Sequence, residues 1–311
     1  MTQSVPATRR LSAGSAPLLT LPGVALERLF DGGKWCEGPV YFPASDSVVF
    51  SDIPNNRLMQ WIPGLGCRVL NENSDFANGG TRDAQGRLIS CRHLSHSVVR
   101  IEHDGSQTTL ASHYKGAALN SPNDLVVAAD GAIWFTDPSY GILSDYEGKR
   151  RDSEIGGCFV YRIAPGDIGH PQMVCDSLLM PNGLAFSPDE SKLYVADSSR
   201  SHFSDGHHDI FVFDVIDGCR LGPKQHFFRI DHGVPDGLRI DELGNLWCSS
   251  ARGIEVISPL AEHLDHIPVP EPVANLTFGG AHNATLFITA STSLYSITVG
   301  VRGANARMPA P

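Results

Sequence analysis

The sequence predicts an all-β fold assembled from repeated units. Helical periodicity is almost absent along the 311 residues, and short strand-like runs recur instead, separated by Gly, Asp, Asn and Pro. The 31 Gly and 21 Pro are typical of a β protein that is rich in turns. A pattern of Pro, then Asn or Asp, then strand, turn and strand recurs along the chain, which indicates an internal repeat.

Six units share this layout of two successive strands. They occupy residues 37–52, 78–91, 121–137, 180–197, 234–250 and 275–290. A third strand is predicted after each unit, at residues 57–63, 97–103, 158–164, 209–215, 253–259 and 293–299. Fourth strands are predicted in five of the units, at residues 67–72, 107–112, 172–177, 225–230 and 263–269. The spacing therefore predicts six four-stranded sheets, with one strand missing from the sixth.

The missing strand is predicted to come from the other end of the chain. Residues 24–30, VALERLF, have the pattern of a strand, and such a strand would close a ring and remove the exposed edges of an open array. We therefore predict a single six-bladed β-propeller with four-stranded blades over residues 24–300. An N-terminal extension, residues 1–23, precedes it, and a polar C-terminal tail, residues 301–311, follows. Residues 139–157, in the longest gap, are expected to form a surface insertion.

The composition argues against several classes of partner. The net charge is −10 and the charges are dispersed, so no basic patch indicates nucleic acid. No segment reaches the length of a transmembrane helix, and the N-terminus lacks the apolar run of a signal peptide. The seven Cys are scattered without a CxxC pair, which favours reduced thiols over disulfides or a zinc site. We expect a cytoplasmic protein, a monomer or a homodimer, with no membrane or nucleic-acid partner.

The repeat aligns one polar residue near the start of each unit, which we call its pivot. The first strand of each propeller blade lines the central channel, so the pivots are expected to converge at one end of it. The six pivots are Glu37, Asn78, Asn123, Asn182, Asp236 and Asn275. One interpretation is that Asn and Asp simply begin strands after turns. Glu is a poor turn residue, so Glu37 weakens that interpretation.

A divalent cation is the other interpretation of the pivots. The carboxylates of Glu37 and Asp236 have no Lys or Arg among the other pivots to balance them. Ca²⁺ accepts carboxylates, amide carbonyls and waters as ligands, so it is the predicted metal. The absence of His and Cys from the pivots argues against a typical zinc site. Mn²⁺, Fe²⁺ and Zn²⁺ remain open alternatives.

Four motifs resemble those of one known family. They are EGPVYF (37–42), NSPNDLVVAADGAIWFTDPSYG (120–141), MPNGLAFSPDESKLYVADS (180–198) and PDGLRIDELGNLW (235–247). In this order they resemble the gluconolactonase, senescence-marker-protein and luciferin-regenerating-enzyme family, in particular its bacterial gluconolactonase-like branch. The resemblance covers residues 25–300. It implies a six-bladed propeller that holds one divalent metal at the channel mouth and hydrolyses sugar lactones.

The resemblance also implies roles for particular residues. The family's metal-binding positions fall on Glu37, Asn182 and Asp236, and the position of Asn123 contacts the metal directly or through water. Two departures lie near the expected pocket. Ser121 stands where animal members have a substrate-holding Arg, and Arg92 stands where bacterial relatives often have an acidic residue. The identity of the substrate therefore does not follow from the resemblance.

Lactone opening needs a polarised carbonyl, an activated water and a stabilised oxyanion. A divalent metal can supply the first and the third. Asp236 is the predicted general base, and the alternative is that it only binds a metal that itself activates the water. Asn123 and Asn182 are expected to orient the lactone and its oxyanion as well. The residues expected to bind sugar hydroxyls are Ser121, His93, Arg82, Tyr140 and Asp197.

Three functions are compatible with these residues. The first is hydrolysis of an aldonolactone such as glucono-1,5-lactone to the aldonic acid. The second is a related metal-dependent hydrolase acting on xenobiotic lactones or phosphotriesters, which an apolar pocket wall would favour. The third is a non-enzymatic propeller scaffold, against which the acidic pivots argue. No G-x-S-x-G motif supports a serine hydrolase. The His-rich residues 201–209 are predicted to form a solvated loop near the pocket rather than a metal site.

Overall fold

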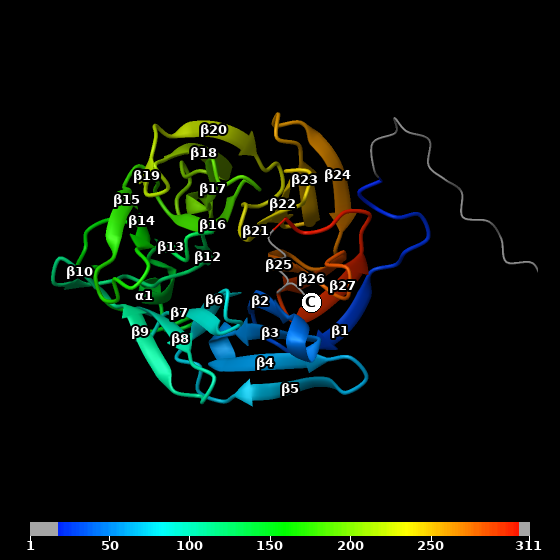
Figure 1. The fold of residues 1–311 in the computed structure, drawn as a ribbon, viewed down its shortest axis with the longest axis horizontal. Coiled ribbons are helices and arrows are strands. Elements are labelled where there is room, and N and C mark those ends of the chain that lie inside the picture. The colour runs from blue at the N-terminus through cyan, green and yellow to red at the C-terminus, as the bar shows by residue number, and fades with distance from the viewer. Residues whose placement is uncertain (1–17, 305–311) are drawn as a thin grey trace, which may run out of the picture.

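The computed structural model describes residues 18–304 and is nearly all β. Six antiparallel sheets form a ring around a central channel, which confirms the predicted six-bladed propeller (Figure 1). Residues 1–17 of the predicted extension and residues 305–311 of the predicted tail lie outside the described residues. Within residues 18–304 no helix is long and apolar enough to cross a membrane.

The first three blades each contain four strands, which follow one another from the channel outward. Blade 1 consists of β2 (Cys36–Phe42), β3 (Ser47–Asp52), β4 (Arg57–Ile62) and β5 (Gly66–Asn71). Blade 2 consists of β6 (Ala77–Arg82), β7 (Leu88–Arg92), β8 (Ser97–Ile101) and β9 (Gln107–Ala111). Blade 3 consists of β12 (Leu125–Val127), β13 (Ile133–Asp137), β14 (Phe159–Ile163) and β15 (Gln172–Cys175).

The other three blades complete the ring. Blade 4 consists of β16 (Pro181–Phe186), β17 (Lys192–Asp197), β18 (Asp209–Ile216) and β20 (Gln225–Arg229), and the short β19 (Arg220–Leu221) also pairs with β18. Blade 5 consists of β21 (Leu238–Ile240), β22 (Leu246–Ser250), β23 (Gly253–Ile257) and β24 (His263–Pro268). Blade 6 consists of β25 (Val273–Gly279), β26 (Thr285–Ala290), β27 (Ser293–Thr298) and β1 (Glu27–Asp31).

The N-terminal strand closes the ring, as predicted. Strand β1 pairs antiparallel with β27, with Phe30 opposite Leu294, so the two ends of the propeller share one sheet. This pairing fills the fourth position of blade 6, which no strand after β27 occupies within the described residues. Ring closure removes the free edges that a row of six sheets would leave.

The core lies between the blades rather than inside one layer. Each pair of neighbouring blades shares a cluster of buried apolar side chains, and six such clusters follow the ring within the described residues. Between blades 5 and 6, for example, the rings of Trp247 and Phe278 lie 5.4 Å apart at nearly a right angle. The strands nearest the channel are almost entirely buried, whereas outer strands such as β5 are largely exposed.

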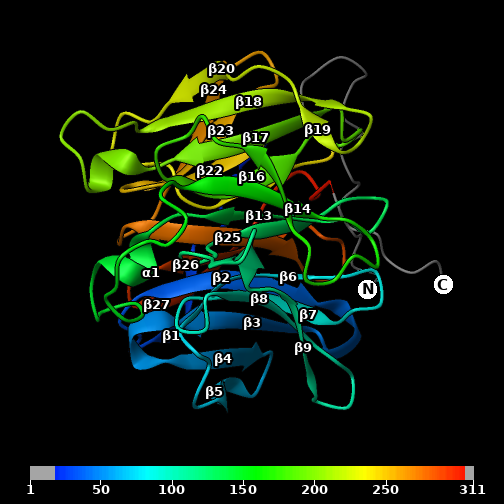
Figure 2. The same cartoon turned by 90° about the vertical axis from the view of Figure 1, so that its left-hand side faces the viewer.

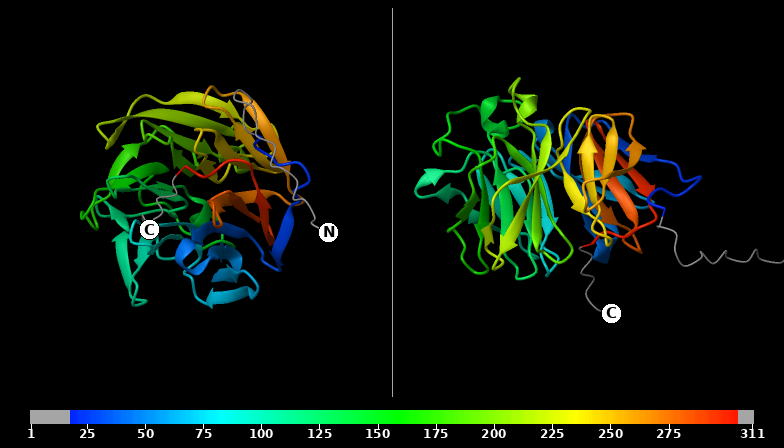
Figure 3. Two further views of the ribbon diagram at one scale, coloured as in Figure 1. Left: turned by 45° about the vertical axis from the view of Figure 1, so that its right-hand side comes forward. Right: turned by 90° about the horizontal axis from the view of Figure 1, so that it is seen from above.

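The insertion between β13 and β14 forms an ordered cover. It contains the one-turn helix α1 (Tyr140–Leu143), which the sequence did not predict. The amide of Lys149 donates to the carbonyl of Gly141, so the segment folds back on its own helix. Figures 2 and 3 show α1 at one face of the ring and the red C-terminal segment at the opposite face. The two channel mouths are therefore covered by different parts of the chain.

A few short elements lie outside the blades. They are the two-residue hairpin strands β10 (His113–Tyr114) and β11 (Ala117–Ala118), and 3-10 turns at Pro43–Ser45, Ile53–Asn55 and Ser199–Ser201. All seven cysteines fall in the described part of the chain and are free, as the sequence predicted.

Candidate active site

The pivots meet because each blade is tied to the next at that level. The amide of Gly79 donates to the carbonyl of Asn123 (2.7 Å), and that of Gly183 donates to the carbonyl of Asp236 (3.1 Å). In these two units the residue after the pivot is a glycine, because the neighbouring blade leaves no room for a side chain there. A Cβ on Gly183 would lie 2.0 Å from the carbonyl oxygen of Asp236. We call this level of the channel, with the six pivots, the pivot ring.

Glu37 is buried on β2 and points to its neighbours in the ring. Its Oε2 accepts hydrogen bonds from the amide of Gly38 (2.6 Å) and from Nδ2 of Asn275 (3.0 Å). Burial raises the pKa of Glu37, and the nearby Asp124 raises it further. No cation contacts the carboxylate in the described structure, so its negative charge is uncompensated by protein side chains.

Asp124 is a buried acid that the sequence analysis did not single out. Its Oδ2 accepts a hydrogen bond from Nδ2 of Asn275 (3.3 Å), so one amide group bridges Asp124 and Glu37. On its other side Oδ2 lies 3.7 Å from a guanidinium nitrogen of Arg239. Burial raises the pKa of Asp124, and Arg239 opposes that rise. The available signal was that blade 3 has Asp where the neighbouring units have Gly after the pivot.

Asp236 is half-buried beside the side chain of Asn182, which donates a hydrogen bond to its carboxylate. Burial raises the pKa of Asp236 well above its usual value, and the charges of Glu37, Asp124 and Glu147 add to the rise. Glu147 belongs to the insertion, and burial raises its pKa to about 7. The sequence analysis missed Glu147, since a carboxylate in a polar loop carries no signal of its direction. Four acids therefore influence one another at this mouth.

Tyr140, the first residue of α1, lies at the same site. Its hydroxyl oxygen is buried, and burial together with the charge of Asp236 raises the pKa of the phenol. The hydroxyls of Ser198 and Ser201 are the other polar groups near it. The ring of His202 lies 5.3 Å from the Tyr140 ring, so the His-rich loop does reach this pocket.

Two other residues expected to bind sugar hydroxyls, His93 and Ser121, form hydrogen bonds within the protein. The Nδ1 of buried His93 donates to the carbonyl of Glu147 (2.7 Å), which leaves Nε2 to accept from Nδ2 of Asn78 (3.1 Å). Ser121 is fully buried, donates to the carbonyl of Pro138 (2.6 Å) and accepts from the amide of Gly141 (3.0 Å). Both side chains hold the insertion in place through these bonds, and their contact with substrate stays a prediction.

Asp197 and Arg82 also depart from the expected pocket wall. The buried carboxylate of Asp197 accepts the backbone amides of Leu179 (2.8 Å) and Ser199 (3.1 Å), so it fixes the turn before blade 4's pivot. Arg82 stands at the far end of β6, four residues beyond Asn78, and lines a cavity at the opposite channel mouth. The structure therefore does not bring Arg82 together with Asp236.

The residues of the pivot ring fit a hard divalent cation. The buried or half-buried carboxylates of Glu37 and Asp236 have no cationic partner, and amides of the neighbouring pivots surround them. Within residues 18–304 no three His, Cys, Asp or Glu side chains are arranged to hold a metal ion. Asn oxygens would therefore have to complete the coordination, as Ca²⁺ accepts. Asn123 and Asn182 are both buried at this level.

Comparison with known proteins places the chain in a family. The model of the "SMP-30/Gluconolactonase/LRE-like region" matches residues 35–292. The chain belongs to this family. The resemblance found in the sequence motifs is thereby confirmed. The match runs from just before β2 to just before β27, so it includes strands of all six blades and all six pivots.

Several relatives of known name are similar over most of their length. A gluconolactonase of Zymomonas mobilis is 31% identical over 288 residues, which cover 85% of this chain and 78% of that protein. A 6-deoxy-6-sulfogluconolactonase of Pseudomonas putida is 31% identical and covers 82% of each chain. The solved structure of a gluconolactonase of Xanthomonas campestris is 36% identical, with a TM-score of 0.84 over 96% of this chain and 100% of that one.

Proposed function

We propose that this protein is a lactonase that opens an aldonolactone, such as glucono-1,5-lactone, to the aldonic acid. The observation that carries the proposal is the pair of uncompensated carboxylates, Glu37 and Asp236, at one channel mouth. This mouth lies in a chain whose named relatives include gluconolactonases and a sulfogluconolactonase. The hydroxyls and rings of Tyr140, Ser198 and His202 make the surroundings polar, which suits a sugar better than an apolar phosphotriester.

The metal would be held by oxygen atoms of four pivots, namely Glu37, Asn123, Asn182 and Asp236. When bound there, a divalent cation, in our proposal Ca²⁺, would polarise the lactone carbonyl and stabilise the charge that develops on its oxygen. This role also explains why a fold would keep two acids buried together, because an unpaired buried carboxylate costs free energy.

The chain's own groups would carry the proton transfers. Asp236 is half-open to the pocket and is placed to take a proton from the attacking water. The water oxygen bonds to the carbonyl carbon, the ring C–O bond breaks, and the alkoxide that leaves receives a proton. The amide of Asn182 orients the Asp236 carboxylate, and the Tyr140 hydroxyl, buried beside Ser198 and Ser201, would donate to a substrate oxygen.

The test is metal removal followed by addition of single metals. The protein is treated with a chelator, dialysed, and assayed with 1,4- and 1,5-aldonolactones, an aromatic ester and a phosphotriester. Ca²⁺, Mn²⁺, Zn²⁺ and Fe²⁺ are each added back alone. We expect chelation to abolish aldonolactone hydrolysis and Ca²⁺ to restore it. Full activity without metal, or activity on the phosphotriester alone, would contradict the proposal.

A further inference from the structure

The second channel mouth contains a cavity that the proposed reaction does not use. It has a volume of about 220 Å³ and lies where the first strands end, with Gly303 and Ala304 of the C-terminal segment in its lining. It is lined from all six blades by residues that include Tyr41, Arg82, Val127, Phe186, Arg239 and Phe278. We call it the far-mouth cavity. Its volume is below the roughly 300–1,000 Å³ of pockets for drug-sized ligands, so its occupant would be small.

Arg82 is the unusual group in this cavity. Its side chain is half-buried, and within residues 18–304 its guanidinium makes no hydrogen bond and no ion pair. Burial lowers the pKa of Arg82, and the phenol of Tyr41 is the only nearby group that opposes this. A guanidinium has five N–H donors in a rigid plane, and those of Arg82 reach solvent rather than a protein acceptor within the described residues. An anion in the cavity would satisfy these donors.

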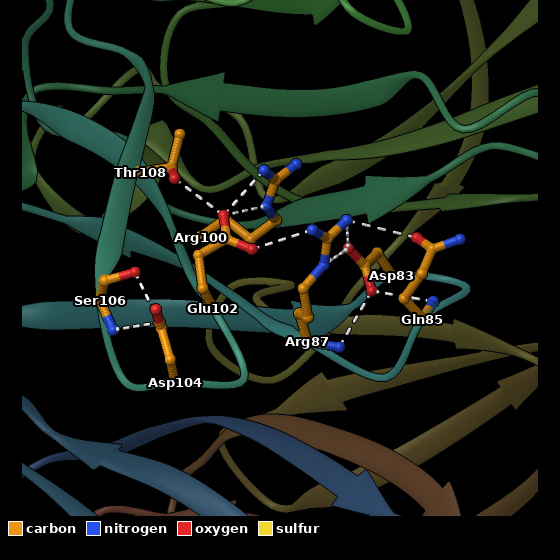
Figure 4. Close-up of polar contacts among 8 residues, drawn as sticks. All are labelled: Asp83, Gln85, Arg87, Arg100, Glu102, Asp104, Ser106 and Thr108. Atoms are coloured by element: carbon orange, nitrogen blue, oxygen red, sulfur yellow. Dashed lines mark hydrogen bonds and ion pairs between the residues drawn. The ribbon is translucent and has the colours of Figure 1, made fainter.

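Two acids line the cavity, Asp83 and Glu190, and each accepts hydrogen bonds from groups other than Arg82. The Asp83 carboxylate accepts Nε of Arg87 (2.7 Å), and Arg87 also binds Glu102, as Figure 4 shows. Both oxygens of Glu190 accept the backbone amide of Ala129 (2.8 and 2.9 Å). Neither acid forms an ion pair with Arg82, so the guanidinium keeps its donors for another partner.

Arg239 supplies a second cation from the other side of the channel. One guanidinium nitrogen donates to the carbonyl of Leu238 (2.6 Å) and forms an ion pair with Asp124 (3.7 Å), so the charge of Arg239 is partly balanced. The remaining donors of Arg239 are uncommitted within the described residues. Arg82 on β6 and Arg239 on β21 thus face one small cavity from two blades. Planar guanidinium groups bind carboxylate and phosphate oxygens in pairs of parallel hydrogen bonds.

We propose that the far-mouth cavity binds a small oxyanion, a carboxylate or a phosphate-like group, through Arg82 and Arg239. The cavity opens at the opposite mouth and adjoins the pivot ring through the contact of Arg239 with Asp124, and the proposal does not depend on the lactonase function. Its ligand carries one planar or tetrahedral anionic group and little else, because the cavity is small and its lining also contains apolar residues such as Val127, Phe186 and Phe278.

Binding is tested by calorimetric titration of the dialysed full chain with sulfate, inorganic phosphate and acetate, at low ionic strength. Sulfate and phosphate represent the tetrahedral class and acetate the carboxylate class, so the three titrations distinguish the two sources. We expect saturable binding of one class with one site per chain. Absence of saturable binding of all three anions would overturn the proposal.

Variants locate the site. Arg82→Gln is expected to weaken binding at least about tenfold, since it removes a charge-assisted pair of hydrogen bonds. Arg82→Lys keeps the positive charge but lacks the paired N–H donors of a guanidinium, and it is expected to weaken binding less than Arg82→Gln does. Arg68→Gln, at an exposed arginine on β5 that bonds only Gln60, is the matched control and should bind as the wild type does. Equal affinity of the wild type and Arg82→Gln would refute the site.

A crystallographic measurement gives an independent check if a variant folds poorly. Crystals of the wild-type chain soaked in selenate should show an anomalous peak within hydrogen-bond distance of both Arg82 and Arg239. Thermal unfolding of each variant accompanies the titrations, so that lost binding is separated from lost structure. A peak at the pivot ring and none in the far-mouth cavity would count against the proposal.

Discussion

Asn275 is the residue that links the acids of the pivot ring. Its single NH₂ group donates to Glu37 and to Asp124, while its Oδ1 accepts the amide of Leu276 (2.9 Å). The sequence identified Asn275 as a pivot without giving it a role. In the structure it fixes the direction of a proposed metal ligand and separates two like charges. Such groups behind a metal ligand typically change metal affinity by about 10–100-fold when they are lost.

Asn275→Leu is therefore expected to weaken metal binding by about 10–100-fold, because Glu37 loses its fixed orientation. The measurement is a competition titration with a fluorescent metal indicator, which does not depend on catalysis. Thr277→Val on the same strand is the matched control, since its hydroxyl makes only a 3.5 Å contact with the carbonyl of Phe278. If both variants bind metal equally well, Asn275 does not position Glu37.

Asp236→Asn tests the proposed base. The substitution keeps an oxygen ligand and removes the proton acceptor, so we expect metal to stay bound while kcat falls by about 10²–10⁴-fold. Bound metal is quantified by elemental analysis on the same sample as the kinetics. Near-normal turnover with metal retained would show that Asp236 is a ligand only.

At the scale of elements, the insertion between β13 and β14 decides the shape of the pocket. It places Tyr140 and Glu147 at the pivot ring, and His93 and Ser121 anchor it from blades 2 and 3. A Cβ on Gly141 would lie 2.5 Å from the His93 ring, so ring and loop are in tight contact. Two residues that we expected to bind substrate therefore also position this insertion.

The His93 anchor makes the stability of the protein depend on pH. Burial lowers the pKa of His93 to about 4, from an ordinary value of 6.5. Between these pH values the His93 ring is protonated in the unfolded chain and neutral in the folded chain. The free energy of unfolding therefore decreases as the pH falls from 6.5 towards 4. At pH 5 the loss from this group is about 2 kcal/mol.

Denaturant unfolding at pH 7.5 and pH 5 measures this contribution. His93→Gln lacks the titrating ring, so we expect it to lose about 2 kcal/mol less than the wild type between the two pH values. The comparison between pH values cancels the constant cost of the lost hydrogen bonds. An identical pH dependence in both proteins would mean that His93 takes up its proton in the folded state.

For the whole molecule, the pairing of β1 with β27 closes the ring of blades. The Phe30 ring lies 5.6 Å from that of Phe50, so β1 joins the apolar cluster between blades 6 and 1. Phe30→Ala should lower the free energy of unfolding by about 2 kcal/mol, less than the 3–5 kcal/mol of a fully buried Phe. Urea denaturation measures it, with Val24→Ala, before the strand, as the control. No difference between the two would show that blade 6 holds without β1.

The sequence alone determined much of the architecture. Period-two strands and a repeated Pro–Asn/Asp start predicted six blades, and the unpaired apolar run at residues 24–30 predicted the closing strand, found at Glu27–Asp31. These features are local or follow from repetition, so the repeat itself reveals them. The same alignment placed Glu37, Asn123, Asn182 and Asp236 at one channel level, because equivalent positions in a closed ring must meet.

Tertiary structure alone decided which other side chains join that level. Asp124 and Glu147 join the site. The side chains of His93, Ser121 and Asp197 form hydrogen bonds with the backbone of neighbouring segments. Side chains that alternate along a strand, or that lie in a long loop, carry no sequence signal for direction. Arg82 shows the same limit, since four residues of rise along β6 carry it to the opposite mouth. Repetition determines where the blades meet, and packing between distant segments determines what the meeting point can bind.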